Sequence, residues 1–426
     1  MDKKYDKYGV SDMTVMIEDY GGFTYLVEVF ARYFKRVLYY SPYESEFARS
    51  QPFIVGTGIP NVERIDNVDD YESQTDLFFF SDLHKGARQE RLRDAGKAVF
   101  GSGKIQDLEL YRTKLKELLK DLDLPVNEYE VAHGFSELKE KLKGKKDVWV
   151  KSDFFRGDGE TFRYQDDECG IDALMDLERD LGINKEKEDF IIEEPIKDAV
   201  EYGYDGFVCT NGFPDKTLFG IEVKDASYCA VFTDYDKLPK TTREANEKLL
   251  PIFMSKNYNG WYSSEERCTK KDFSYYLDMT ARLGEPPTSL ACEMFKDYPI
   301  YCWEIANSIV PKIESKAKYG VQLIIKSDRA IHHPQRIFFP EKYKEFVKVK
   351  SLHIDENGHY IFVPQSTGMT EIGAIVYYAD TLKAAKEGVI KIAKEVRGYG
   401  LKINLSALDE AESVVANLKK YGVNLF

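Results

Sequence analysis

The sequence has little that would anchor it in a membrane or cross-link it covalently. Its six cysteines are scattered, and no CxxC pair occurs. This spacing fits a reducing cytosol better than a disulfide framework or a zinc site. No apolar run approaches the ~20 residues of a membrane-spanning helix, and the N-terminal MDKKYDKYGVSD has no apolar signal-peptide core. We therefore expect a cytoplasmic protein with no membrane partner.

An excess of positive charge is also absent. The chain has 60 Lys and Arg against 73 Asp and Glu, which gives a net charge of -13. Binding to a phosphate backbone needs a basic face, so we expect no nucleic acid polymer as a partner. A few local Lys and Arg can still hold small phosphorylated molecules. The six histidines are scattered and offer no convincing Ser-His-Asp or Cys-His set.

The chain has enough apolar material for several folded domains. With 426 residues, it is too long for one ordinary core and suggests two to four domains. Its hydrophobic content is 43%, with 29 Tyr and 26 Phe, which argues against long disorder. We find no internal repeat and no low-complexity linker.

The first hundred residues alternate short apolar runs with helical patterns. Strands are predicted at MTVMI, RVLYY, PFIVGT and DLFFFSD, and a helix from Phe23 to about Tyr33. Such alternation predicts a parallel α/β sheet with crossover helices. Residues 107–122 predict a single amphipathic helix, residues 217–233 antiparallel strands, and the last 115 or so residues a smaller α+β domain.

A polar pattern stands out in YYLDMTARLGEPP, residues 275–287. Asp278, Thr280 and Arg282 alternate with apolar residues, so they share one face of a strand. Glu266 lies twelve residues before Asp278, and TKKDFS between them predicts a hairpin turn near Asp272. Glu266 and Asp278 would then face each other, and two facing carboxylates repel unless a cation such as Mg²⁺ lies between them. A solvent-facing strand of mixed charge is the alternative.

The order of these motifs resembles the ATP-grasp superfamily. That family has an acid and, about twelve residues later, an acid-x-Asn-x-Arg strand, which Glu266, Asp278, Thr280 and Arg282 match with Thr in place of Asn. Upstream, the chain is similar to the phosphoribosylamine-glycine ligase family. That similarity rests on Phe100-Gly101-Ser102, Leu108-Glu109, Lys116 and Pro125, and it covers most of the chain.

The resemblance implies an ATP-grasp fold, α/β and α+β in class, in four parts. These are a Rossmann-like pre-ATP-grasp domain (1–108), a lid subdomain (109–190), a large subdomain with the metal site (191–310) and a C-terminal α+β domain (311–426).

The resemblance also implies roles for particular side chains. Lys116 and Lys151 would contact the ATP phosphates, and Lys151 also the adenine edge; a solvated lysine is the alternative for Lys116. Arg156, Gly157 and Gly159 would belong to a loop that closes over the triphosphate, unless that loop is a plain surface turn. Three acids are open candidates for the ribose: Glu193, Glu194 and Glu201. The metal ligands would be Glu266, Asp278 and Thr280, binding Mg²⁺ or alternatively Mn²⁺, with Arg282 as the catalytic cation.

The implied activity is that of an ADP-forming carboxylate-amine ligase with an acylphosphate intermediate. Its partners would be small molecules, with glycine and phosphoribosylamine of purine biosynthesis as the nearest precedent. Ser81-Asp82 and Gly284-Glu285-Pro286-Pro287 depart from that family, which leaves another amine open. The sequence leaves both a monomer and a homodimer open. The alternative is an ATP-grasp protein with altered catalysis and a regulatory or structural role, which Thr280 and Asp158 would favour.

Overall fold

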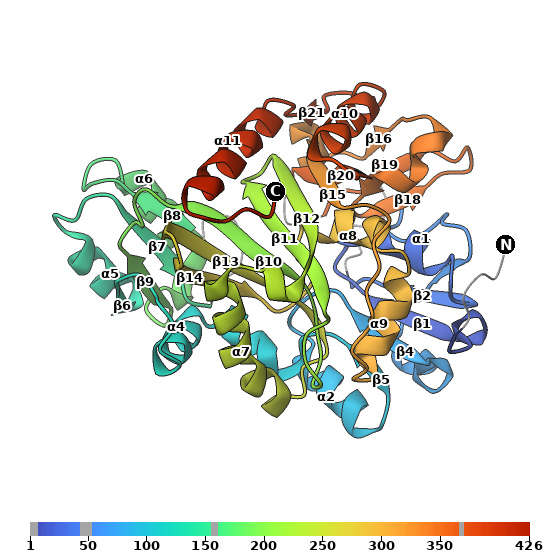
Figure 1. The fold of residues 1–426 in the computed structure, drawn as a ribbon, viewed down its shortest axis with the longest axis horizontal. Coiled ribbons are helices and arrows are strands. Elements are labelled where there is room, and N and C mark those ends of the chain that lie inside the picture. The colour runs from blue at the N-terminus through green and yellow to red at the C-terminus, as the bar shows by residue number, and fades with distance from the viewer. Residues whose placement is uncertain (1–6, 43–52, 155–160, 366–369) are drawn as a thin grey trace.

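The structure is a computed structural model that describes residues 7–42, 53–154, 161–365 and 370–426 (Figure 1). Within these residues the strands form a five-stranded, a four-stranded, a three-stranded and a nine-stranded sheet. The expected mixture of a parallel α/β part with antiparallel parts is confirmed.

The N-terminal part is a parallel sheet with the spatial order β3-β2-β1-β4-β5. Its central strands are runs of buried apolar residues, as expected for parallel strands covered on both faces. The strands and their helices are β1 (Thr14–Glu18), α1 (Leu26–Phe30), β2 (Arg36–Tyr40), β3 (Val62–Arg64), β4 (Leu77–Phe80), α2 (Gly86–Asp94) and β5 (Ala98–Phe100).

The strand predicted at PFIVGT is wrong. The described part of this segment, residues 53–57, forms no strand, and the third strand of the sheet comes later, at β3. Gly56 and Gly58 have φ values of +83° and +76°. These left-handed conformations turn the chain and cannot continue a strand.

The single helix predicted for residues 107–122 is also wrong. The chain forms α3 (Gln106–Leu110) and α4 (Arg112–Asp121), separated by extended backbone at Tyr111, with φ −115° and ψ 93°. Asp153 explains the break, because its carboxylate accepts hydrogen bonds from the Thr113 amide (2.6 Å) and hydroxyl (2.9 Å). The contact with Asp153, forty residues further along the chain, thus favours the start of α4.

A small antiparallel sheet forms a separate lobe with the order β6-β9-β7-β8. Its core, which includes Phe135, Val150 and Phe190, is distinct from the main core of the molecule. The elements are β6 (Tyr129–His133), α5 (Gly134–Leu142), β7 (Val148–Ser152), β8 (Thr161–Tyr164), α6 (Ile171–Leu181) and β9 (Asp189–Glu193). We call this lobe the lid.

The nine-stranded antiparallel sheet is the centre of the molecule. Its order is β14-β13-β10-β11-β12-β15-β20-β17, with β21 paired to β15, so it runs without a break past residue 310. Its strands are β10 (Val200–Val208), β11 (Lys216–Val223), β12 (Ser227–Asp234), β13 (Gly260–Lys270), β14 (Phe273–Thr280), β15 (Tyr319–Lys326), β17 (Val347–Val349), β20 (Glu371–Ala379) and β21 (Lys402–Ile403).

Two helices cover one face of this sheet, on the side that faces the viewer in Figure 1. They are α7 (Lys240–Ser255) and α11 (Ala407–Lys420). Thr242 of α7 donates to Glu266 of β13, and Ser227 of β12 donates to the Ala407 carbonyl at the start of α11. The opposite face of β10 to β14 is therefore the one left for a site.

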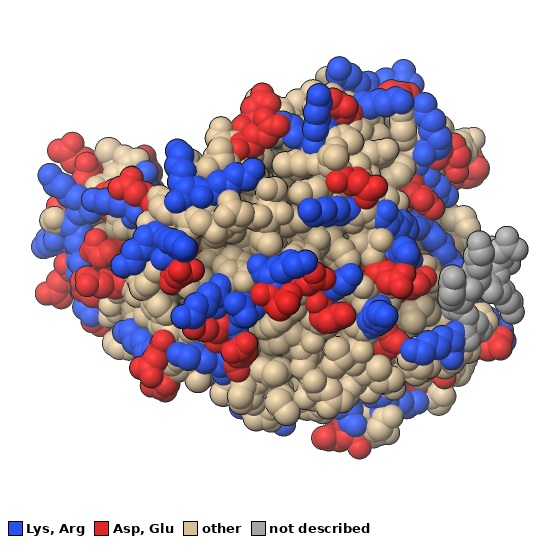
Figure 2. Space-filling view, viewed as in Figure 1, with Lys and Arg blue, Asp and Glu red and all other residues tan. Residues whose placement is uncertain are grey.

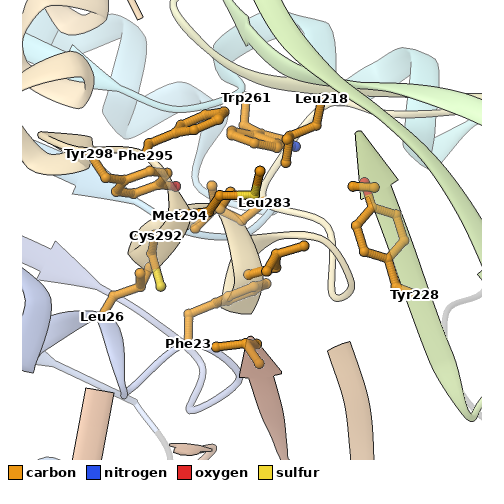
Figure 3. Packing of buried hydrophobic residues seen from close by; sticks show 14 of the residues in the cluster. Phe23, Leu26, Leu218, Tyr228, Trp261, Leu283, Cys292, Met294, Phe295 and Tyr298 are labelled. Carbon is orange, nitrogen blue, oxygen red and sulfur yellow. The ribbon is translucent and has the colours of Figure 1, made fainter. Parts of the chain in front are cut away.

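The helices α8 (Thr288–Met294) and α9 (Tyr298–Ala306) join the parts into one core. Figure 3 shows Phe23 and Leu26 from the N-terminal part close to Cys292 and Met294 of α8. The C-terminal part adds α10 (Leu382–Ala393) and a small sheet of β16 (Gln335–Ile337), β18 (Leu352–Ile354) and β19 (Tyr360–Phe362).

Acidic and basic side chains alternate over the face shown in Figure 2, and no broad basic area gathers there. Among the described helices, none combines the length and apolar character needed to cross a membrane.

Candidate functional site

A cavity of about 400 Å³ opens on the face of the large sheet that lies opposite α7. Its floor is formed by β10 to β14, and its wall includes α3 and α4. The lining is strongly charged, with the carboxylates Glu109, Glu201, Asp205, Glu222, Glu265 and Asp278 and the cations Arg112, Lys224 and Arg282.

The predicted pairing of Glu266 with Asp278 is wrong by one residue. The hairpin forms around Asp272 as expected, but Glu265 lies opposite Asp278, and Glu266 lies opposite Tyr276. Lys270 pairs with Phe273, so Lys271 and Asp272 form the turn, and the register shifts at Cys268/Lys270 and at Glu265/Glu266 offset each other. The pairing is therefore one residue away from that of a turn centred on Asp272, and such an offset moves a side chain to the other face of the sheet. The facing carboxylates exist, with Glu265 in the place expected for Glu266.

Glu266 points away from the cavity, toward α7. Its side chain is buried and accepts hydrogen bonds from the Thr242 and Ser264 hydroxyls, both at 3.0 Å. Burial raises the pKa of Glu266 to about 7. This carboxylate is thus a satisfied core group on the far side of the sheet from Asp278.

Lys224 lies in the middle of the acidic floor. Its Nζ is 3.0 Å from Glu201 Oε1, 3.3 Å from Glu222 Oε2 and 3.4 Å from Glu265 Oε2. Burial opposes a charged lysine here, but the three carboxylates outweigh it and raise the pKa of Lys224. Burial and repulsion from Glu201 raise the pKa of Glu265 to about 7.

The carboxylates of Glu265 and Asp278 fit a magnesium ion better than a transition metal. The described residues include no group of three or more His, Cys, Asp or Glu arranged as a metal site. Mg²⁺ needs fewer protein ligands, because it binds one or two carboxylates and completes its shell with water and substrate phosphates. Thr280 also lines the cavity, beside Ser263 of the neighbouring strand.

Arg282 lies where β14 meets α3 and the end of β4. Its Nε is 2.9 Å from Glu109 Oε1 and 3.3 Å from Asp82 Oδ1. The other oxygen of Glu109 accepts a hydrogen bond from the Ala281 amide at 2.7 Å. Burial raises the pKa of Glu109, although Arg282 acts against it. These contacts fix the guanidinium at the cavity wall.

Lys116 and Lys151 meet at Glu193 in the lid. Lys116 Nζ is 2.9 Å from Glu193 Oε1, and Lys151 Nζ is 3.0 Å from Oε2. Burial would raise the pKa of Glu193, but the two ammonium groups outweigh it and lower that pKa, while burial lowers the pKa of Lys116. The alternative stated for Lys116 was a solvated lysine. It is buried instead, and it also donates to Asn127 Oδ1 at 2.8 Å.

The remaining predicted residues lie in different places. Glu201 lines the cavity, where Arg267 also pairs with it at 2.5 Å, and Glu194 is exposed at the end of β9. Arg156, Gly157 and Gly159 lie outside the described residues.

Glu222, Lys224 and Asp205 were not predicted from the sequence. Glu222 and Lys224 alternate in IEVKD, and this spacing, read together with Glu201, is the signal that could have revealed them. Asp205 is buried under the cavity and accepts hydrogen bonds from Tyr228 and Ser263, both at 2.6 Å. Burial raises the pKa of Asp205 to about 6.

No family model matches this sequence, and no curated protein matches it. Solved structures do match. Phosphoribosylamine-glycine ligase of Thermotoga maritima superposes with a TM-score of 0.68 at 15% identity, covering 92% of this chain and 99% of that one. The chain has the ATP-grasp fold.

Other structures of the same fold carry nucleotides. The biotin carboxylase domain of Hydrogenobacter thermophilus 2-oxoglutarate carboxylase, solved with MgADP, ADP and bicarbonate, has a TM-score of 0.65 at 11% identity. The match covers 94% of this chain and 98% of the biotin carboxylase chain. An ADP complex of N5-carboxyaminoimidazole ribonucleotide synthetase has a TM-score of 0.60 at 14% identity, covering 90% and 97%.

Proposed function

We propose that this protein is an ATP-dependent carboxylate-amine ligase that forms ADP. The observation that carries the proposal is the cavity, where Glu265 of β13, Asp278 of β14 and Arg282 just after β14 lie together on a fold whose solved examples include ADP complexes. Its substrates are a small carboxylic acid and an amine, and glycine and phosphoribosylamine are the first pair to try.

Each group has a defined task in this proposal. Glu265 and Asp278 would hold Mg²⁺, with Thr280 beside them, and the bound ion would supply positive charge to the ATP phosphates. Lys116 and Lys151 hold phosphate oxygens, with Glu193 as the carboxylate that positions both ammonium groups. Glu194 is the ribose candidate, because Glu193 and Glu201 are already paired with cations. Arg156, Gly157 and Gly159 stay predictions for the closing loop.

The chemistry rests on positioning and charge. A carboxylate oxygen of the acid attacks the γ-phosphorus, the bond to the β-γ bridging oxygen breaks, and ADP leaves. Arg282, fixed by Glu109, stabilises the charge on the transferred group. The amine nitrogen then attacks the acyl carbon, phosphate leaves, and the amine loses a proton as the amide forms.

A second function has one observation in its favour. Lys224 already places a positive charge among three carboxylates of the cavity. A protein that keeps this cation would bind nucleotide without turnover and act in regulation or as a structural subunit.

The hairpin offers a matched test of the nucleotide binding that both functions require. We expect Asp278→Asn and Glu265→Gln to weaken Mg-ATP binding about tenfold or more, because each removes a carboxylate from the cavity. Glu266→Gln is the control, since the neighbouring side chain faces α7, and its affinity should stay near that of the wild type. Calorimetric titration measures all three variants.

The wild-type protein is then screened for ADP release with pairs of an amino acid and an amine. ADP release with one pair supports the ligase, and binding without release from any pair supports the second function. Equal affinity in all the proteins would refute a metal and phosphate role for this hairpin.

A further inference from the structure

A second cavity, of about 490 Å³, lies in the C-terminal part of the molecule. It shares no lining residue with the cavity on the large sheet. Its floor is the stretch around the end of β16, residues 337–340, and its walls are the turn before β19 and the segment after α10, elements that lie together in Figure 1. Cavities of this size hold small-molecule ligands. We call it the C-terminal cavity.

Backbone pairing holds the floor of this cavity between its two walls. Ile337 pairs with Tyr360 of β19. The next residue, Phe338, exchanges two backbone hydrogen bonds with Arg397, each 2.8 Å long. The floor is therefore fixed by a sheet on one side and by the segment after α10 on the other. A site that is formed before its ligand arrives loses little ordering entropy on binding.

Aromatic rings line the floor and one wall of the C-terminal cavity. Phe338 is 39% exposed, and its ring centroid lies 5.3 Å from that of His359 in an edge-to-face arrangement. Phe339 and Tyr360 form a second edge-to-face pair at 5.0 Å. His359 is held in place, because its Nδ1 lies 3.1 Å from Asp355 Oδ2. The exposed part of the Phe338 ring is thus the apolar surface that a ligand with a flat ring would cover.

Charged side chains of both signs line the same cavity. Lys394 and Arg397 follow α10, and Glu341 follows the floor. All three are exposed, and within the described residues their side chains form no ion pair or hydrogen bond. Glu395 also lines the cavity, but it already pairs with Lys342 at 3.7 Å. Two cations and one carboxylate therefore remain for a ligand.

We propose that the C-terminal cavity binds an aromatic amino acid. The ring of the ligand packs against Phe338, its carboxylate binds Arg397 and Lys394, and its ammonium group binds Glu341. Arg397 is the main partner of the carboxylate, because a guanidinium group can donate two parallel hydrogen bonds to it. The site goes beyond the proposed function, since it uses neither ATP nor the residues of the large-sheet cavity.

Calorimetric titration of the full chain with L-phenylalanine, L-tyrosine and L-tryptophan tests the proposal. Three analogues of phenylalanine each lack one recognised group: phenylalaninamide lacks the carboxylate, 3-phenylpropanoate lacks the ammonium group, and alanine lacks the ring. We expect each analogue to bind about tenfold more weakly than phenylalanine, because each loses one of the three contacts. The proposal is overturned if none of the three amino acids binds, or if any analogue binds phenylalanine's site as tightly as phenylalanine does.

Substitutions assign each contact to a residue. Arg397→Gln should weaken phenylalanine binding about tenfold and leave phenylalaninamide binding unchanged, because the amide has no carboxylate to lose. Glu341→Gln should weaken phenylalanine and phenylalaninamide alike and leave 3-phenylpropanoate unchanged. Phe338→Ala should weaken all three ligands. Lys383→Gln is the control, since this exposed lysine lies at the other end of α10 and should change nothing.

The pattern across ligands separates a binding site from a general disturbance of the fold. Arg397 and Glu341 are exposed, so both variants should unfold like the wild type in denaturant. If Arg397→Gln weakens phenylalanine and phenylalaninamide equally, the carboxylate contact is refuted and the proposal falls. A non-hydrolysable ATP analogue should bind equally to the wild type and to all these variants. Failure to bind that analogue would count against the ligase proposal alone, because the amino acid titrations contain no nucleotide.

Discussion

A single carboxylate that serves two cations shapes the lid side of the candidate site. Glu193 lies between Lys116 and Lys151. One acid positions two ammonium groups there and leaves a net positive charge. This arrangement suits the binding of an anion, because the cations are held in place without being neutralised.

Substitution of Glu193 tests this arrangement. Glu193→Gln leaves two buried lysines without their carboxylate, so we expect a loss of roughly 3 kcal/mol in the unfolding free energy of the lid. The pKa of Glu193 is lowered in the fold, so its contribution is present above the ordinary pKa and is lost as pH falls through the lowered one. Denaturant unfolding at pH 7 and at lower pH measures the loss.

Glu194→Gln is the control for that prediction, because Glu194 is exposed at the next position. Its unfolding should match the wild type at every pH. A loss in Glu194→Gln as large as that in Glu193→Gln would contradict a specific role for the shared carboxylate.

At the residue scale, part of the site could be predicted from the sequence. Asp278, Thr280 and Arg282 were expected to share one face because strand alternation is regular, and all three line the cavity. Glu266 was misassigned because Lys271 and Asp272 form the turn, which is therefore not centred on Asp272, and a shift of one residue in the pairing exchanges the two faces of the strand. Lys224 was missed because its carboxylate partners come from three strands, which only the folded sheet brings together.

At the scale of elements, the positions of strands were predicted more accurately than the points at which elements end or break. Apolar runs such as RVLYY coincide with the observed strands, because a strand that is covered on both faces needs apolar side chains at consecutive positions. The break at Tyr111 could not be predicted, since it depends on Asp153 of the lid. The continuation of the large sheet into the C-terminal part depends on pairing between β12 and β15, which are distant in sequence.

The N-cap of α10 gives a prediction at this scale. Thr381 Oγ1 accepts a hydrogen bond from the Ala384 amide at 3.2 Å, and Ala385 and Val389 of the helix are buried. We expect Thr381→Ala to lower the unfolding free energy by about 1 kcal/mol. Thr381→Ser keeps the hydroxyl and should stay near the wild type in the same urea titration. Equal loss in both variants would assign the effect to the lost methyl group instead.

At the scale of the whole molecule, a buried ion cluster joins three segments. Glu293 of α8 pairs with Arg32, which follows α1, at 2.9 Å and with Lys348 of β17 at 2.5 Å. Burial would raise the pKa of Glu293, but the two cations outweigh it and lower the pKa to about 2. The N-terminal part, α8 and the C-terminal part of the sheet thus depend on one carboxylate.

Glu293→Gln should loosen this junction. Removing one charge leaves the buried cations uncompensated, which costs roughly 3–5 kcal/mol in unfolding free energy at pH 7. Because the folded pKa is below the ordinary value of 4.5, the contribution of Glu293 is complete above about 4.5 and is lost as pH falls toward about 2. The difference between wild type and variant should therefore shrink over that range.

Denaturant unfolding followed by tryptophan fluorescence measures this difference, since Trp261 and Trp303 lie in β13 and α9 beside the junction. Glu314→Gln is the control, because that exposed acid pairs with Lys296 at the surface and should contribute little. A difference between wild type and Glu293→Gln that stayed constant from pH 7 to pH 2 would mean that packing around α8, and not the charge of Glu293, holds the three segments together.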